Sequence, residues 1–340
     1  MKKQILLAMT VVTLAFGLIG CGNKNATNSN GQTEGTKEET TEETTEEATE
    51  GTNIGEETGT RTIKDVKGEV DIPVAPQRIV DISGASDILS ILGYDVIGTA
   101  NSDGYDYTKF PTYLEDVLGD AKILGYSMLA EMDVEAIIAL EPDLIVISTV
   151  QEKMYDQLSK IAPVVMIELK QMDWKEDFRH VANVFGEEEK ATTWINEYLA
   201  KAEEVGKRIK ETYGEEDTYL SFLASGGSLF LFDSAGLGTI FYDDMGLAKP
   251  EGMPAQENVS LPVVTYEGLA EIDADHIFAI ATEEDLTALK NSSIWNGTKA
   301  VKNGNVVELP ASPYFNQGYS PIGRAAFVEE VESLLAGANE

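Results

Sequence analysis

Seven aromatic side chains lie in segments that follow predicted strands, where open α/β sheets place their binding loops. Aromatic rings offer a large flat contact area at a small entropic cost, and tyrosine and tryptophan add a polar tip. This chemistry suits a bulky, partly apolar chelate or macrocycle. We expect only some of the rings to face such a ligand, because a loop aromatic more often packs against its neighbours. The candidate ligand-binding residues are Tyr105, Tyr107, Tyr126, Trp174, Tyr314, Phe315 and Tyr319.

Patterns that indicate catalysis are missing from the sequence. It contains no GxSxG nucleophile elbow, no HExxH zinc-protease motif and no phosphate-binding P-loop. Acidic pairs are frequent, but they are expected by chance in so acidic a chain. We therefore predict no catalytic residue and a protein that is not an enzyme. A surface-anchored hydrolase that uses two carboxylates is the alternative from a different class.

A bare metal ion is a poor candidate ligand, because zinc and manganese sites need several histidines and carboxylates that converge. The chain has only two histidines, of which His180 falls on a predicted helix and His276 in a predicted strand. Haem held by an axial ligand would have to use Met128 or Met172, which lie in predicted loops. We expect no metal site and no resident cofactor.

The N-terminus has the pattern of a secretory leader. Lys2 and Lys3 precede an apolar run over residues 5–19, which is too short for a comfortable membrane span. The run leads into the tetrapeptide LIGC, which resembles the lipobox of bacterial lipoproteins, and Cys21 is the only cysteine of the chain. We expect residues 1–21 to be a signal peptide and Cys21 to carry a diacyl anchor, whose two chains suffice for stable tethering. An ordinary signal peptide with an incidental cysteine is the alternative.

Residues 22–60 form a predicted linker that is rich in Glu, Thr and Gly and almost free of large apolar side chains. Such a segment buries too little surface to offset its ordering entropy, so we expect disorder. The chain carries a net charge of −34, of which the leader contributes +2 and the linker −8, leaving −28 on residues 61–340. Nucleic acid and anionic lipid headgroups are therefore poor partners.

Two segments repeat the same small unit. Residues 133–148 and 265–280 each read as a capped helix start, a short helix, a turn and a strand. We interpret their shared acidic residues as helix caps and turn formers rather than as ligand contacts. The four residues that we interpret in this way are Glu135, Asp143, Glu267 and Asp275.

Short apolar strands alternate with helical patterns on both sides of one long amphipathic segment. This alternation predicts parallel sheets with right-handed crossovers. Residues 187–213 keep apolar side chains at helical spacing over 27 residues, about 40 Å of helix. We predict an α/β protein with an N-terminal lobe over 61–186, a bridging helix over 187–213 and a C-terminal lobe over 214–340. One large α/β domain with a long crossover helix is the alternative.

In this order along the chain, several segments resemble the ABC-transporter substrate-binding proteins of the iron-siderophore, haem and cobalamin type. The resemblance covers roughly residues 61–336 and rests on PQRIVDIS with DILSILGYDVIGTA, VEAIIALEPDLIVIS, the long helix, TYEGLAEIDADHIFAI and YFNQGYSPIGRAAFVEEVESLL. It implies the class III fold, with two Rossmann-like lobes joined by one rigid helix and a ligand in the cleft between them.

The resemblance also implies partners and a location. A monomer tethered to the outer face of the cell membrane would deliver its ligand to a permease that an ATPase subunit drives. A ferric-siderophore-type chelate is the expected ligand, and a corrinoid or haem is the alternative. Members that bind anionic catecholates have several cations in the cleft, whereas residues 61–340 hold only five arginines, which favours a neutral or hydroxamate-type chelate. The loop cations retained as weak candidates are Lys109, Lys170 and Lys249.

Members of this family present an acidic residue on each lobe to arginines of the permease. In this chain the N-lobe position matches Asp87, at the start of a predicted helix, where the family more often has glutamate. Asp243 and Asp244 are the candidates on the C-terminal lobe. We therefore predict that these aspartates dock the protein on its permease.

Overall fold

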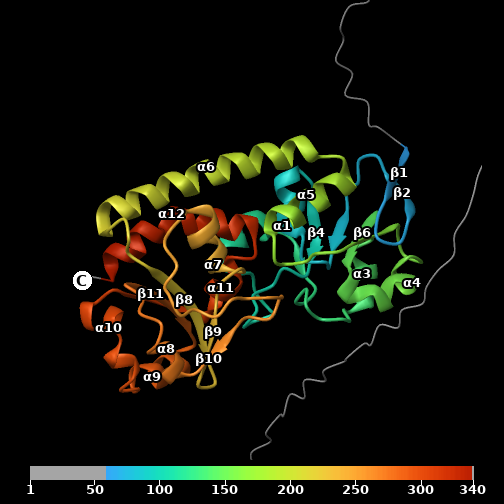
Figure 1. Cartoon of the computed structure of the whole chain (residues 1–340). Helices are drawn as coiled ribbons and strands as arrows, with labels where there is room; N and C mark the ends of the chain where they lie inside the picture. Colours follow the sequence, from blue (N-terminus) through green and yellow to red (C-terminus); the bar gives the residue numbers. More distant parts are fainter. Residues whose placement is uncertain (1–58, 339–340) are drawn as a thin grey trace, which may run out of the picture. The chain divides into compact units, whose positions relative to one another are not determined.

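The computed structural model describes residues 59–338 and contains two five-stranded sheets, one in each half of the chain (Figure 1). All strands of the first sheet run parallel, and every residue of β3, β6 and β7 is buried, as expected when helices cover both faces. Its spatial order is β5 (Lys122–Ile123), β4 (Val96–Thr99), β3 (Ile79–Asp81), β6 (Leu144–Ser148) and β7 (Val164–Ile167).

The second sheet combines a parallel core with an antiparallel edge. Strand β11 pairs in parallel with β8 and β12, whereas β9 pairs antiparallel with both β8 and β10. The spatial order is β10 (Val263–Val264), β9 (Ser228–Leu231), β8 (Tyr219–Ser225), β11 (His276–Ala281) and β12 (Val306–Pro310). The expected two lobes with parallel-rich sheets are thereby confirmed.

Helices cover the two sheets, and a hairpin that the sequence analysis did not predict precedes the first one. The hairpin consists of β1 (Thr60–Lys64) and β2 (Glu69–Pro73). The helices of the N-terminal lobe are α1 (Ser86–Leu92), η1 (Thr112–Leu114), α2 (Glu115–Leu118), α3 (Val134–Ala139), η2 (Thr149–Met154), α4 (Tyr155–Leu158) and α5 (Trp174–Phe185). Those of the C-terminal lobe are α7 (Leu237–Thr239), η3 (Ile240–Asp244), α8 (Tyr266–Leu269), α9 (Glu283–Lys290), η4 (Trp295–Gly297), α10 (Lys299–Asn303), α11 (Ala311–Gln317) and α12 (Pro321–Gly337).

The repeated unit forms α3 with β6 and α8 with β11, and its two aspartates Asp143 and Asp275 have structural roles. Asp143 accepts hydrogen bonds from the backbone N–H groups of Gln77 and Arg78, at 2.7 and 2.9 Å. Asp275 accepts one from the backbone N–H of Thr218 at 3.0 Å. Each aspartate thus fixes the chain entering the neighbouring strand, because an ordered loop must satisfy its backbone donors.

Helix α6 (Glu188–Tyr213) joins the two halves and confirms the predicted long helix. Its buried stripe contributes Ala191, Ile195 and Tyr198 to the same apolar core as Phe178 of α5 and Phe327 of α12. It packs on α5 of the N-terminal lobe and on α12 and η3 of the C-terminal lobe. In Figure 1 it runs along both lobes, on the side away from the β8–β9 hairpin. Because one apolar core includes residues of both lobes and of α6, the helix is packed firmly against both lobes and is not a free linker.

Gly206 marks the closest approach of α6 to the C-terminal lobe. A Cβ atom at this position would lie 2.0 Å from the carbonyl oxygen of Met245. We expect Gly206→Ala to lower the free energy of unfolding by about 1–2 kcal/mol, because overpacking outweighs the gain in helix propensity. Gly337→Ala in the last turn of α12 is the matched control, because a Cβ atom added there meets no other part of the protein within 4 Å. This variant should have unchanged or slightly higher stability. Urea unfolding measures both, and a Gly206→Ala protein as stable as wild type would contradict the close approach.

Three helices that the sequence pattern predicts differ in the structure. Residues 151–162 have the pattern of one helix, but they are divided between η2 and α4, because Ser148 caps the chain with Gln151, whose backbone is not helical. Residues 236–246 also have a helical pattern, but this segment ends in the π-helical turn η3. The pattern predicts a last helix over about 318–335, whereas α12 begins at Pro321, where Ser320 accepts a hydrogen bond from the backbone of Gly323, and a separate helix α11 precedes it.

The predicted signal peptide, its Cys21 and most of the predicted linker lie outside the described residues, although Thr60 already belongs to β1. Among residues 59–338, no helix combines the length and the apolar character that crossing a membrane requires.

Candidate functional site

The two lobes meet where loops that follow N-lobe strands contact α11 and the start of α12. Three hydrogen bonds cross this boundary. Ser312 donates to the Asp103 carboxylate at 2.6 Å, and the Asn316 amide donates to the Tyr126 hydroxyl at 3.1 Å. The Ser320 hydroxyl donates to the Asp87 carboxylate at 2.5 Å. Since the carboxyl ends of strands are where open α/β sheets bind ligands, this boundary is the candidate site.

Four of the seven predicted aromatic residues come together at the boundary. Tyr107 stacks on Tyr126 with ring centroids 5.0 Å apart and an interplanar angle of 9°. Tyr105 meets Phe315 of the other lobe edge-on at 5.9 Å. Tyr105 and Tyr107 are each 44 % exposed, so both rings keep free area for a ligand. Flat, partly exposed rings of this kind fit the contact chemistry predicted for a bulky chelate.

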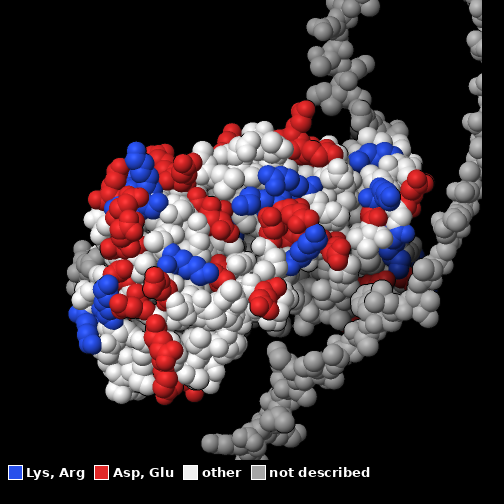
Figure 2. Space-filling view, viewed as in Figure 1, with Lys and Arg blue, Asp and Glu red and all other residues white. Residues whose placement is uncertain are grey.

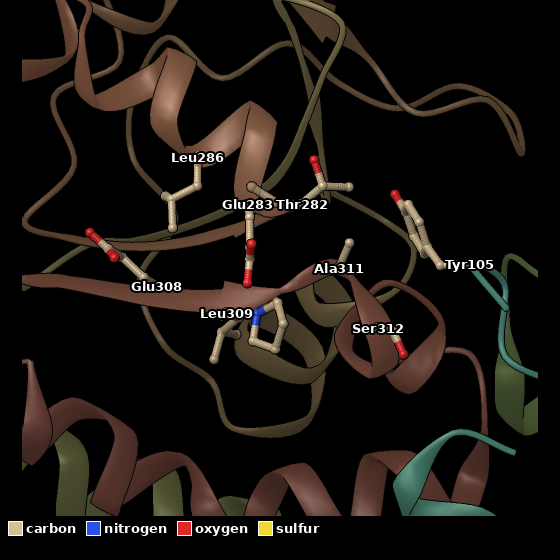
Figure 3. A pocket seen from close by; sticks show the side chains of 10 residues that line it. Tyr105, Thr282, Glu283, Leu286, Glu308, Leu309, Ala311 and Ser312 are labelled. Atoms are coloured by element: carbon tan, nitrogen blue, oxygen red, sulfur yellow. The ribbon is translucent and has the colours of Figure 1, made fainter. Parts of the chain in front are cut away.

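A cavity of about 400 Å³ opens beside Tyr105 (Figure 3). Tyr105 lines it from the N-terminal lobe, and the other walls come from the carboxyl ends of β11 and β12 and the helices that follow them. In the close-up view, Thr282, Glu283 and Leu286 lie on one side of the cavity and Leu309 on the other. The volume falls in the range of small-molecule sites, which are mostly apolar with a few placed polar groups.

The other three predicted aromatic residues lie away from the cavity. Trp174 is the first residue of α5 and only 8 % exposed, with its ring edge-on to Tyr198 of α6 at 5.1 Å. Tyr314 donates its hydroxyl to Glu330 of α12 at 3.2 Å. Tyr319 packs beside Gly236, and burial raises its pKa well above the ordinary value. The structure therefore places these three rings in the framework of the lobes.

Several residues of the site escaped the sequence analysis because they are small or acidic rather than aromatic. Asp103, Ser312 and Asn316 take part in two of the hydrogen bonds between the lobes. Thr282 and Glu283 line the cavity directly after β11. Their position after a strand is the signal that could have found them, and it was applied only to aromatic residues and lysines.

The docking predictions for Asp87 and Asp244 are wrong, because both carboxylates are buried. Asp87 is 2 % exposed and faces Ser320 inside the boundary. Asp244 is 5 % exposed and pairs with Arg324. A carboxylate enclosed in this way cannot pair with an arginine of another protein. Asp243 is exposed and stays a prediction.

Burial raises the pKa of Asp87 from 3.8 to about 6, although hydrogen bonds from Ser320 and the Ile88 backbone oppose the shift. The Asp87 carboxyl therefore binds its proton more tightly in the folded protein than in the unfolded chain. Ionising this buried carboxyl destabilises the folded state; the effect is absent below about pH 4, grows as the pH rises to about 6 and is constant above that pH. We expect Asp87→Asn to be about 1–2 kcal/mol more stable than wild type at pH 7 and nearly equal to it at pH 4. Urea unfolding across this pH range measures the difference, and a gap that does not change with pH would contradict the assignment.

The loop cations are all paired with carboxylates of the protein itself. Lys109 lies 3.5 Å from Asp106, Lys170 lies 2.6 Å from Glu176, and Lys249 forms an ion pair with Asp233. On the face shown in Figure 2, basic side chains alternate with acidic ones and form no broad basic patch. The site therefore offers little positive charge to a highly anionic ligand.

Among residues 59–338, no three His, Cys, Asp or Glu side chains converge on one point. His276 is buried in β11, 3.1 Å from Asp217 and stacked on Tyr219. The sulfur atoms of Met128 and Met172 accept hydrogen bonds from the side-chain amides of Gln171 and Gln256, at 3.4 and 3.7 Å respectively. These two methionines lie at the loop edge of the N-terminal lobe.

Two α/β lobes, one connecting helix and a cavity beside Tyr105 at the strand ends are the architecture of a bilobal ligand-binding protein. The family model described as "Periplasmic binding protein" matches residues 105–313. The chain belongs to this family, and its relatives are siderophore-type substrate-binding proteins of ABC transporters rather than enzymes.

The relatives resemble the chain over most of its length. It is 30% identical to the iron(3+)-hydroxamate-binding protein FhuD of Bacillus subtilis, over 80% of this chain and 86% of that protein. It is also 30% identical to the probable siderophore-binding lipoprotein YfiY of the same organism, over 74% of this chain and 80% of that protein. The solved structure of the iron-uptake substrate-binding protein PiuA from Streptococcus pneumoniae is 26% identical with a TM-score of 0.62, covering 82% of this chain and all of that one. The predicted class III fold is confirmed.

Proposed function

We propose that this protein captures a ferric siderophore-type chelate between its two lobes and delivers it to an ABC permease that an ATPase subunit drives. The observation that carries the proposal is the cavity between Tyr105 and the carboxyl ends of β11 and β12. The stacked pair Tyr107 and Tyr126 extends the aromatic surface of the same boundary. The iron is cargo inside its chelator, so the site needs no protein ligand to the metal.

Two lines of support favour a hydroxamate-type chelate over an anionic catecholate. Lys109, Lys170 and Lys249 are already paired with carboxylates, so few free cations would balance the charge of a catecholate complex. Two relatives are named for binding iron(3+)-hydroxamate.

The proposal includes the cellular setting. Lipid attached to Cys21 would hold the protein on the outer face of the cell membrane, and the acidic segment over 22–60 would let a monomeric body reach both its ligand and the permease. Two of the relatives are named as lipoproteins, which supports this arrangement. Asp243 is the one exposed docking candidate retained from the sequence.

A ligand panel tests the binding step. The purified protein is titrated with ferric hydroxamates, ferric catecholates, haem and cobalamin, and binding is followed by quenching of tryptophan fluorescence and by native mass spectrometry. We expect saturable one-to-one binding that is tightest for a ferric hydroxamate, with no chemical change of the ligand. Tight binding of haem or cobalamin alone, or turnover of the ligand, would refute the proposal.

A further inference from the structure

One carboxylate in the cavity wall is unused by the protein. Glu308 lines the cavity but pairs with Lys290 at 2.6 Å. Glu283 lines it as well, and its carboxylate makes no hydrogen bond or ion pair with any described residue. In Figure 3 the Glu283 side chain extends from the start of α9 toward β12, into the cavity beside Leu286.

The surroundings of Glu283 add negative rather than positive charge. Asp285, two residues further along α9, accepts hydrogen bonds from Thr282 and from the backbone of Gly226. Across the cavity, burial raises the pKa of Tyr105, and the carboxylates of Asp285 and Asp103 raise it further. Because the carboxylates of Asp285 and Asp103 oppose ionisation of the Tyr105 phenol, the electrostatic potential on this side of the cavity is negative.

We infer that the cavity selects a chelate that carries a positive charge beside its metal core, held by the Glu283 carboxylate. This inference rests on the proposed function and specifies its ligand class. Three hydroxamates neutralise Fe(III), so a linear trihydroxamate that ends in a primary ammonium group carries a net charge of +1 when iron-loaded. The methylene chain of such a ligand suits the apolar wall formed by Leu286, Leu309 and Pro310, and the ammonium suits the carboxylate beside it.

The helix itself supplies a matched control. Glu283, Glu284 and Asp285 all occupy the first turn of α9, where acidic side chains stabilise the helix dipole. Both glutamates are exposed, but Glu284 does not line the cavity, whereas Glu283 does. If Glu283 only stabilised the helix dipole, Glu283→Gln and Glu284→Gln would change ligand affinity equally. The inferred role predicts that only Glu283→Gln changes the preference for the charged chelate.

The experiment compares two ferric chelates that differ in one group. The first is a linear ferric trihydroxamate with a terminal primary ammonium, and the second is its neutral N-acetylated form. We expect wild type and Glu284→Gln to bind the charged form about fivefold more tightly, and Glu283→Gln to bind both forms alike. The preference should shrink at high salt, because a partly exposed pair is screened. Dissociation constants come from fluorescence titration, with thermal melting to verify folding.

The outcomes separate the inference from the function beneath it. Equal affinity of the wild-type protein for the two forms overturns the inference while leaving the proposed function intact. A preference that survives in Glu283→Gln also overturns it, because the charge is then sensed elsewhere. Failure of wild type to bind either chelate, together with tight binding of another ligand class, overturns both.

Discussion

Asp244→Asn is expected to lower the free energy of unfolding by about 3–5 kcal/mol. Asp244 and Arg324 form an ion pair in which the side chains are 0 % and 1 % exposed. Arginine cannot give up its proton under ordinary conditions, so the variant leaves a buried positive charge without its partner. Urea unfolding at neutral pH measures the loss.

Two further variants make this prediction specific. Replacing both partners, as Asp244→Leu with Arg324→Met, should recover most of the lost stability, because no unpaired charge remains. Glu329→Gln removes an exposed ion pair with Lys201 from the same helix α12 and should change stability by less than about 0.5 kcal/mol. An Asp244→Asn protein no less stable than the Glu329→Gln protein would show that the buried pair contributes little.

The Asp244–Arg324 pair also connects the two lobes with the helix between them. Tyr198 of α6 donates its hydroxyl to Asp244 at 2.8 Å, and the Arg324 guanidinium lies 4.8 Å from the ring centre of Trp174 on α5. Lys175, next to Trp174, lies 3.8 Å from Asp244. The N-terminal lobe, the connecting helix and the C-terminal lobe therefore share one buried charged cluster. Such a cluster restricts movement between the lobes, because separating them would expose or unpair its charges.

The fold could be read from the sequence because its signals are local and repeated. The apolar spacing over 187–213 predicted α6 to within one residue at its start, and the matching segments 133–148 and 265–280 predicted α3–β6 and α8–β11. Parallel strands with helices between them produce long apolar runs at regular intervals. The short β1–β2 hairpin was missed, because its five-residue strands carry mostly polar side chains and border the acidic linker.

The site was less predictable because its contacts join residues that are far apart in the chain. Asp103 and Ser312 are 209 residues apart and Asp87 and Ser320 are 233 apart, yet each pair is hydrogen-bonded. Asp87 was assigned to the surface because its position matches the docking residue of the family that the chain resembles, and a carboxylate in a first helical turn gives no sign of burial when only the sequence is known. Trp174 was assigned to a loop because its packing against α6 is visible only in three dimensions.

Tyr105→Ala is expected to weaken binding of a ferric hydroxamate about 30-fold. An aromatic ring can bury about 150–250 Å², and the Tyr105 side chain leaves 44 % of its surface free beside the cavity. Covering roughly 90 Å² at about 25 cal/mol per Å² corresponds to about 2 kcal/mol of binding free energy. Fluorescence titration of both proteins with the same chelate measures the change.

Ring area and hydrogen bonding can be told apart at this position. The Tyr105 hydroxyl makes no hydrogen bond with any described residue, so Tyr105→Phe should keep its affinity within about threefold of wild type if ring area dominates. Tyr155→Ala is the control for losing a partly buried tyrosine elsewhere, because that ring lies on α4 under Lys67 and outside the cavity. If Tyr105→Ala bound the chelate as tightly as Tyr155→Ala, the cavity beside Tyr105 would not be where the ligand is held. The stacked Tyr107 and Tyr126 would then be the next rings to test, since they offer the other exposed aromatic face of the boundary.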